Sequence, residues 1–155
     1  MPLQSITRKE IEAQPILFIQ RRIVHTELQT SMAECFGTLF GHAMQTGLAI
    51  AGRPTARYVD TGPGLWTVDF VLPLAKPAEA QDDMQDGFLY AGAVACAIHA
   101  GPYEELAETN AAIERWIEEH GFTINGSPWE SYITSPAEEP DPKNWITEVY
   151  WPISG

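Results

Sequence analysis

A carboxylate and a phenol lie two residues apart near the end of the chain. Glu148 and Tyr150 belong to residues 145–153, WITEVYWPI, where apolar and polar residues alternate and β-branched and aromatic types dominate. This pattern predicts a strand, and a strand places residues i and i+2 on the same face. A carboxylate beside an aromatic ring can attract a cation or accept a proton. Glu148 and Tyr150 are therefore the first candidates for a functional site.

An earlier segment has the same pattern. Residues 66–74 read WTVDFVLPL, and Asp69 lies there where Glu148 lies in the later segment. Trp66 and Trp145 begin the two segments, and each could line a ligand groove or pack into the core. We expect Asp69 to support Glu148 in selecting a positive charge.

Further aromatic and acidic residues occupy a second predicted strand. Trp129, Glu130 and Tyr132 are close together, and the alternation places Glu130 and Tyr132 on one face. Tyr58 is the counterpart of Tyr132 in an internal repeat described below, so two tyrosines could frame a groove symmetrically. Tyr103 follows a His-Ala-Gly-Pro turn at the start of a predicted helix. Its ring is either a groove wall or a helix staple.

The histidines and cysteines favour structural roles. His25 and His99 have the same spacing as Tyr58 and Tyr132, but neither histidine has a second ligand at metal spacing. We expect a strand-end histidine bonded to the backbone, and we predict neither a metal site nor a cofactor. Cys35 and Cys96 fall in stretches predicted to be buried, where a thiol packs as a small hydrophobe.

A constant spacing between like residues indicates the internal repeat. One spacing is shared by His25/His99, Gly47/Gly121, Ile50/Ile124, Gly52/Gly126, Pro54/Pro128 and Tyr58/Tyr132, and a slightly longer one by Trp66/Trp145 and Pro73/Pro152. We predict one domain over residues 1–155, with β-α-β-β halves at approximately 15–74 and 88–153 and a connector at 75–87. The fold class is α+β, with two pseudo-twofold-related modules forming one antiparallel sheet. Helices cover one face of this sheet, and a ligand groove lies on the other.

Each predicted half contains one amphipathic helix. The first runs from about Leu28 to Gly47, and the second from Leu106 to Gly121, because apolar residues recur there at helical spacing and each stretch ends at a glycine. Residues 1–14 read as a short polar lead-in, and residues 88–99 as one strand. The lead-in has no room for a helix-turn-helix motif.

The charge of the chain limits its partners. Its 155 residues include 21 acidic and 9 basic side chains, which gives a net charge of -12. Direct nucleic-acid binding needs clustered Lys and Arg and is therefore not expected. The charge favours a cationic ligand or a protein partner with a basic surface. No segment has the length of a membrane span or the pattern of a signal peptide, so we expect a cytoplasmic protein.

The second half resembles a known family. The motifs HAGPYEEL (99–106), WIEEHGF (116–122), PWESY (128–132) and WITEVYWPI (145–153) are similar to those of the GyrI-like effector-binding domain. This domain also forms the C-terminal sensor of AraC-type and multidrug-responsive activators. The resemblance implies a groove that accepts lipophilic, often cationic, molecules between aromatic rings, with Glu148 as its buried acid. Some members look like hydrolases of strained electrophilic rings, and another inhibits DNA gyrase.

Three functions follow as hypotheses. The first is binding of a lipophilic, cationic small molecule. The second is hydrolysis in the same groove, with Glu148 as general base and Tyr103 or Tyr150 orienting the leaving group. The third is inhibition of a DNA-acting protein such as gyrase. The oligomeric state stays open.

Overall fold

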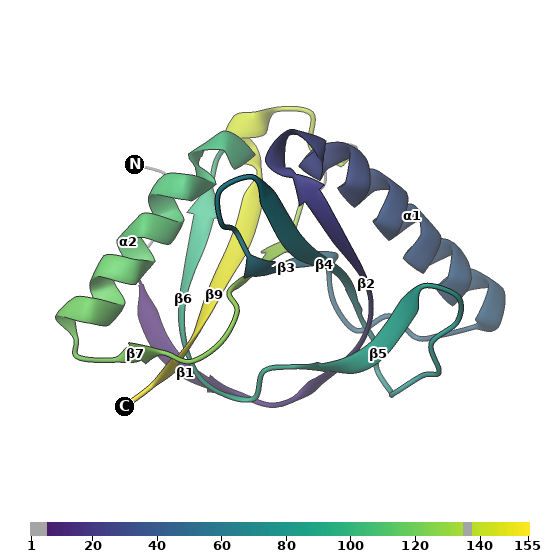
Figure 1. Cartoon of the computed structure of the whole chain (residues 1–155), viewed down its shortest axis with the longest axis horizontal. Coiled ribbons are helices and arrows are strands. Elements are labelled where there is room, and N and C mark those ends of the chain that lie inside the picture. Colours follow the sequence, from purple (N-terminus) through teal and green to yellow (C-terminus); the bar gives the residue numbers. More distant parts are fainter. Residues whose placement is uncertain (1–5, 135–137) are drawn as a thin grey trace. The chain divides into compact units, whose positions relative to one another are not determined.

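The computed structural model describes residues 6–134 and 138–155. The chain divides into two compact units. The N-terminal unit comprises residues 13–90, and the C-terminal unit comprises the chain from Ala91 onward together with the segment before Ala13. Each unit combines one long helix with an antiparallel sheet, which confirms the predicted α+β class (Figure 1). No helix in the described ranges is long and apolar enough to cross a membrane.

The N-terminal unit has strand order β3-β4-β2-β5. Its elements are β2 (Gln14–Val24), the 3-10 turn η1 (His25–Glu27), α1 (Leu28–Thr46), β3 (Thr55–Asp60), β4 (Leu65–Pro73) and β5 (Met84–Leu89). The helix packs on one face of the sheet, where the ring of Phe36 meets the edge of Phe70 at 5.8 Å. We call this face of the unit's sheet the helix-facing face.

The C-terminal unit has strand order β1-β6-β9-β8, and β7 pairs with the end of β9. Its elements are β1 (Thr7–Ile11), β6 (Gly92–Ala100), η2 (Tyr103–Glu105), α2 (Leu106–Glu119), β7 (Thr123–Ile124), β8 (Trp129–Tyr132), η3 (Pro142–Asn144) and β9 (Ile146–Ser154). Ile113 and Ile117 of α2 pack with Val149 and Ile153 of β9 in one apolar core. These contacts define the helix-facing face of this unit.

Both predicted helices are present close to their predicted bounds. The helix α1 ends where Gly47 adopts a left-handed conformation with φ of 72°. Its N–H bonds to the carbonyl of Ala43, and a glycine reaches this conformation without steric cost. Gly121 has a similar φ of 76° just beyond α2.

Two predictions about the strands are wrong. The lead-in contains β1, and the strand predicted at residues 88–99 is divided into β5 and β6, with β5 beginning inside the predicted connector. Strand β1 is the terminal strand in the order of the C-terminal unit, and β5 is the terminal strand in that of the N-terminal unit. Four of the five β1 residues are exposed, and only the two ends of β5 are buried. Edge strands of this kind carry no clear apolar alternation, so the sequence gives little sign of them.

The register of the two units also differs from the constant spacing. His25 lies in η1 and His99 lies in β6, so they are not equivalent positions. The two 3-10 turns begin at His25 and Tyr103, which are further apart in the chain than the repeat pairs that follow the helices. The spacing shortens after the helices because α1 has 19 residues and α2 has 14, a difference of about one turn. By its place in the elements, His25 corresponds to Tyr103.

Candidate functional site

Strand β9 has two different faces, as the sequence predicts. Thr147 and Val149 are fully buried, and Val149 contacts the core beneath α2. Glu148 and Tyr150 lie on the opposite face and are half-buried. Any chemistry of the Glu148 carboxylate therefore takes place away from the helix.

Strand β8 places the second candidate acid on the other face. Glu130 pairs across the sheet with Val149, and Tyr132 pairs with Thr147, so both side chains are on the helix-facing face. The predicted sharing of one face by Glu130 and Tyr132 is consistent with this register. The register also separates them from Glu148 and Tyr150, and the predicted site residues of this unit form two clusters on opposite faces.

The first cluster surrounds Glu130, whose residue is 6% exposed. The Tyr132 hydroxyl donates to Glu130 Oε1 at 2.9 Å, and Asn110 Nδ2 of α2 donates to Oε2 at 3.0 Å. The Asn110 Oδ1 in turn accepts from the indole N–H of Trp151 at 2.9 Å. Burial of a carboxylate is costly unless hydrogen bonds or charges compensate it. These two hydrogen bonds hold the carboxylate in a fixed position.

Two further aromatic rings continue from Tyr132, the tyrosine that donates to this carboxylate. The Tyr103 ring centroid, positioned by η2, is 4.6 Å from that of Trp145 and 5.4 Å from that of Tyr132. The Trp145 indole N–H donates to the Glu139 carbonyl at 2.7 Å. Tyr103 and Trp145 are half-buried, whereas Tyr132 is buried. We call Glu130, Asn110, Tyr103, Tyr132 and Trp145 the Glu130 cluster.

The second cluster is on the face away from α2. The Tyr150 hydroxyl donates to Glu148 Oε1 at 2.9 Å, and the Tyr150 ring stacks on Trp129 at 5.3 Å. Burial, together with the hydrogen bond and negative charge of Glu148, raises the pKa of Tyr150 above its usual value. Lys9 of β1 holds its ammonium 5.1 Å from the centre of the same ring. We call Glu148, Tyr150, Trp129 and Lys9 the Glu148 cluster.

Asp69 in the N-terminal unit is already neutralised. The residue is 2% exposed, and its two oxygens accept from Arg57 Nε and Gln20 Nε2, each at 2.8 Å. Arg57 pairs with Asp69 across β3 and β4, whereas Ser131 pairs with Glu148 across β8 and β9. Within the described residues, no ion pair involves Glu148. The geometry gives Asp69 an ion pair with Arg57, and its expected support of Glu148 in selecting a positive charge stays a prediction.

Tyr58 and Trp66 form an aromatic cluster in the N-terminal unit. Their ring centroids are 6.2 Å apart, and His25 of η1 lies 5.7 Å from Trp66. Tyr58 pairs across the sheet with Val68, and Ile23 pairs with Trp66. The three rings occupy the positions that Tyr132, Trp145 and Tyr103 occupy in the C-terminal unit.

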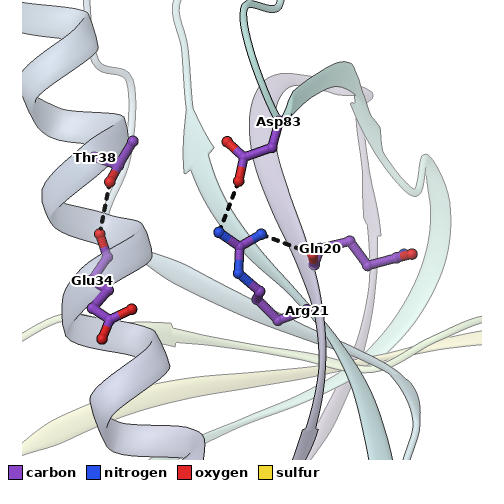
Figure 2. Close-up of polar contacts among 5 residues, drawn as sticks. All are labelled: Gln20, Arg21, Glu34, Thr38 and Asp83. Carbon is purple, nitrogen blue, oxygen red and sulfur yellow. Dashed lines mark hydrogen bonds and ion pairs between the residues drawn. The ribbon is translucent and has the colours of Figure 1, made fainter.

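Other polar contacts of the N-terminal unit lie at its surface. Arg21 donates to Asp83 at 2.8 Å and to the Gln20 carbonyl at 3.2 Å, while Thr38 donates to the Glu34 carbonyl within α1 (Figure 2). The side chains of Arg21 and Asp83 are 40% and 54% exposed, and exposed ion pairs contribute little stability. Their contact holds the segment before β5 against β2.

The sequence analysis did not identify two residues that contact the predicted site residues, Asn110 and Arg57. Asn110 lies four residues after Leu106 and three before Ile113, so its place on the buried stripe of the helix was an available signal. Arg57, the partner of the predicted residue Asp69, had no such signal, because a cross-strand pair depends on register. His99 does bond to the backbone as expected, through Nε2 to the Pro102 carbonyl at 3.1 Å.

Comparison with known proteins identifies the family. Residues 4–154 match the model of the GyrI-like small molecule binding domain, and the chain belongs to this family. A search of curated proteins found no match. The expected resemblance is therefore confirmed.

Solved structures share the fold. The C-terminal domain of EcmrR is 21% identical with a TM-score of 0.82, and the match covers 99% of each chain. In the EcmrR–DNA complex the identity is 21% and the TM-score 0.86, and the match covers 99% of this chain and 58% of that longer one.

Two more distant structures differ in the function that they suggest. SAV2435, bound to tetraphenylphosphonium, is 10% identical with a TM-score of 0.66, over 98% of this chain and 95% of that one. A hydrolase from Listeria innocua is 13% identical with a TM-score of 0.69, over 99% and 94%. At these identities the likeness establishes the fold alone.

Proposed function

We propose that this GyrI-like protein binds a lipophilic cation at the Glu130 cluster, with Glu130 as the counter-charge. The observation that carries the proposal is a carboxylate residue, 6% exposed, that accepts from Tyr132, whose ring begins a series of contacts through Tyr103 to Trp145. Aromatic faces attract cations and supply apolar contact area, while the carboxylate selects positive charge. Such an arrangement favours a ligand that is both lipophilic and positively charged.

The choice of Glu130 over Glu148 rests on the rings. Tyr132 donates to Glu130, and its ring contacts Tyr103, which in turn contacts Trp145; Tyr103 and Trp145 are half-exposed. The Tyr150 ring beside Glu148 already has Trp129 against it and the ammonium of Lys9 near it. A ligand cation at the Glu148 cluster would have to compete with this lysine for the same ring.

The tetraphenylphosphonium complex of SAV2435 gives the proposal a probe. Calorimetric titration of tetraphenylphosphonium into the wild type, Glu130→Gln and Glu148→Gln compares two isosteric charge removals on opposite faces of one sheet. We expect Glu130→Gln to weaken binding about tenfold or more, because a buried charge pair is lost. Glu148→Gln should change the affinity less than threefold. A neutral analogue, triphenylphosphine oxide, should be insensitive to both changes.

Other results would reject this assignment. A loss confined to Glu148→Gln would move the site to the Glu148 cluster, as the resemblance first implied. Equal affinity in all three proteins would show that neither carboxylate serves as counter-charge.

Hydrolysis is the second candidate, favoured by the Tyr150–Glu148 hydrogen bond. The Tyr150 phenol can donate a proton to a leaving group, while Glu148 accepts a proton from water. Tyr103 contacts Tyr132 and Trp145 on the helix-facing side, so it does not suit the role first proposed for it beside Glu148. Of Tyr103 and Tyr150, only Tyr150 suits the role of orienting a leaving group beside Glu148.

Turnover tests this second candidate separately. Hydrolysis of an epoxide such as styrene oxide should be lost in Glu148→Gln and in Tyr150→Phe. Glu119 is exposed at the end of α2, so Glu119→Gln is the control and should retain full activity. Absence of turnover in the wild type, or turnover that survives both changes, would remove the hydrolase hypothesis.

A further inference from the structure

Thr147 presents a polar atom without a hydrogen bond. The residue is fully buried, and within the described part of the chain its Oγ1 has no partner. A buried hydroxyl without a partner is costly and uncommon, and each one calls for a physical explanation. Thr147 pairs across the sheet with Tyr132, a member of the Glu130 cluster.

Two rings of the Glu130 cluster are sheet or chain neighbours of Thr147, and the third contacts both of them. Tyr132 is its cross-strand partner, Trp145 precedes it by two residues on the same face, and the Tyr103 ring contacts both of these rings. Glu130 pairs with Val149, so Glu130 and Thr147 are diagonal neighbours on the helix-facing face. Diagonal neighbours on adjacent strands are about 7–8 Å apart, a distance that long side chains span.

Polar neighbours of Thr147 are engaged elsewhere. His99, opposite Thr147 on β6, binds the Pro102 carbonyl through Nε2 at 3.1 Å and the Thr109 hydroxyl through Nδ1 at 2.6 Å. A carbonyl only accepts, so Nε2 carries a proton, and both ring nitrogens have partners. The Tyr132 hydroxyl donates to Glu130. Within the described part of the protein, no group forms a hydrogen bond with the Thr147 hydroxyl.

We propose that the preferred ligand is a protonated amine, whose N–H donates to Thr147 Oγ1 while Glu130 balances its charge. This inference rests on the proposed function and narrows its ligand class. A quaternary ammonium or phosphonium ion satisfies Glu130 but has no N–H, so it leaves the threonine without a bond. The site therefore discriminates between lipophilic cations by their hydrogen-bonding capacity.

Two ligands that differ only in one N–H group test the inference that the site prefers a protonated amine. Imipramine, a protonated tertiary amine at pH 7, and its N-methyl quaternary derivative differ by one methyl group in place of one N–H. We expect the wild type to bind imipramine about five- to tenfold more tightly, which is the effect of one hydrogen bond. Thr147→Val should remove this preference by weakening imipramine alone, whereas Thr147→Ser should keep it.

The possible outcomes separate the two proposals. Equal affinities of the wild type for both compounds, or an equal loss of both in Thr147→Val, would overturn the amine inference. If Glu130→Gln still weakened both compounds, the proposed function would stand without it. If neither compound bound, both proposals would fall. Thermal unfolding of Thr147→Val should show an unchanged or raised midpoint, because the variant removes an unsatisfied buried hydroxyl.

Discussion

The two units carry similar aromatic rings but different charges beside them. In the C-terminal unit Tyr103 and Trp145 are 4.6 Å apart, and in the N-terminal unit His25 and Trp66 are 5.7 Å apart. Glu130 pairs with Val149 in the former, whereas the fully buried Ala56 pairs with Phe70 in the latter. The comparison indicates that the rings are a shared structural feature, and that the acid makes one unit the candidate for binding a cation.

The acids on the faces away from the helices differ in their cross-strand partners. Asp69 is neutralised by Arg57 at 2.8 Å, whereas Ser131 lies across from Glu148 where the arginine would be. A buried acid with a fixed arginine is part of the fold, since its charge is already balanced. An acid without one can serve an external charge or a proton transfer.

Removal of Arg57 should produce the largest effect on stability. Arg57→Met leaves the Asp69 carboxylate buried without its cation, so the free energy of unfolding should fall by about 3 kcal/mol. Urea denaturation measures this change. Glu10→Ala, which breaks the exposed Arg8–Glu10 pair, is the control and should cost less than about 1 kcal/mol. Similar losses in both variants would remove the distinction between Asp69 and an ordinary surface acid.

Alkaline pH should reveal the coupling within the Glu148 cluster. The raised pKa of Tyr150 means that the folded state keeps this proton at a pH where the unfolded state has lost it. Stability supplied by this group is complete below the unfolded value near pH 10 and declines as pH rises toward the folded value. Above pH 10 the wild type should therefore lose stability, compared with its own stability at neutral pH. Tyr150→Phe should lose less over the same pH range. Identical alkaline profiles would contradict the coupling.

An arginine at Ser131 should have the smallest effect on ligand affinity. Ser131→Arg places beside Glu148 the partner that Asp69 has in the N-terminal unit. Because Ser131 and Glu148 lie on the face away from α2, tetraphenylphosphonium affinity should change less than threefold. The same variant should abolish any epoxide hydrolysis that depends on Glu148. A large loss of affinity would show that the two faces are not independent.

The sequence predicted local structure better than the arrangement of the site. Helix α1 and the two faces of β9 follow from apolar periods of about 3.6 and 2 residues, which side chains impose locally. The short edge strands β1 and β5 have no such pattern. The different helix lengths changed the spacing between the units, so His25 was matched with His99 in place of Tyr103.

The division of the candidate site could not be predicted for a related reason. The alternation within β8 puts Glu130 beside Tyr132, and that within β9 puts Glu148 beside Tyr150. Which pair faces α2 depends on the pairing of Glu130 with Val149, a contact between strands that local patterns do not encode. The Arg57–Asp69 ion pair depends on register in the same way.

A crystal structure with bound tetraphenylphosphonium tests the central claim most directly. We predict phenyl groups against Tyr103 and Trp145, with the phosphonium centre nearer to the Glu130 carboxylate than to that of Glu148. A ligand seated against Tyr150 and Trp129, with Glu148 as the nearest acid, would contradict the account.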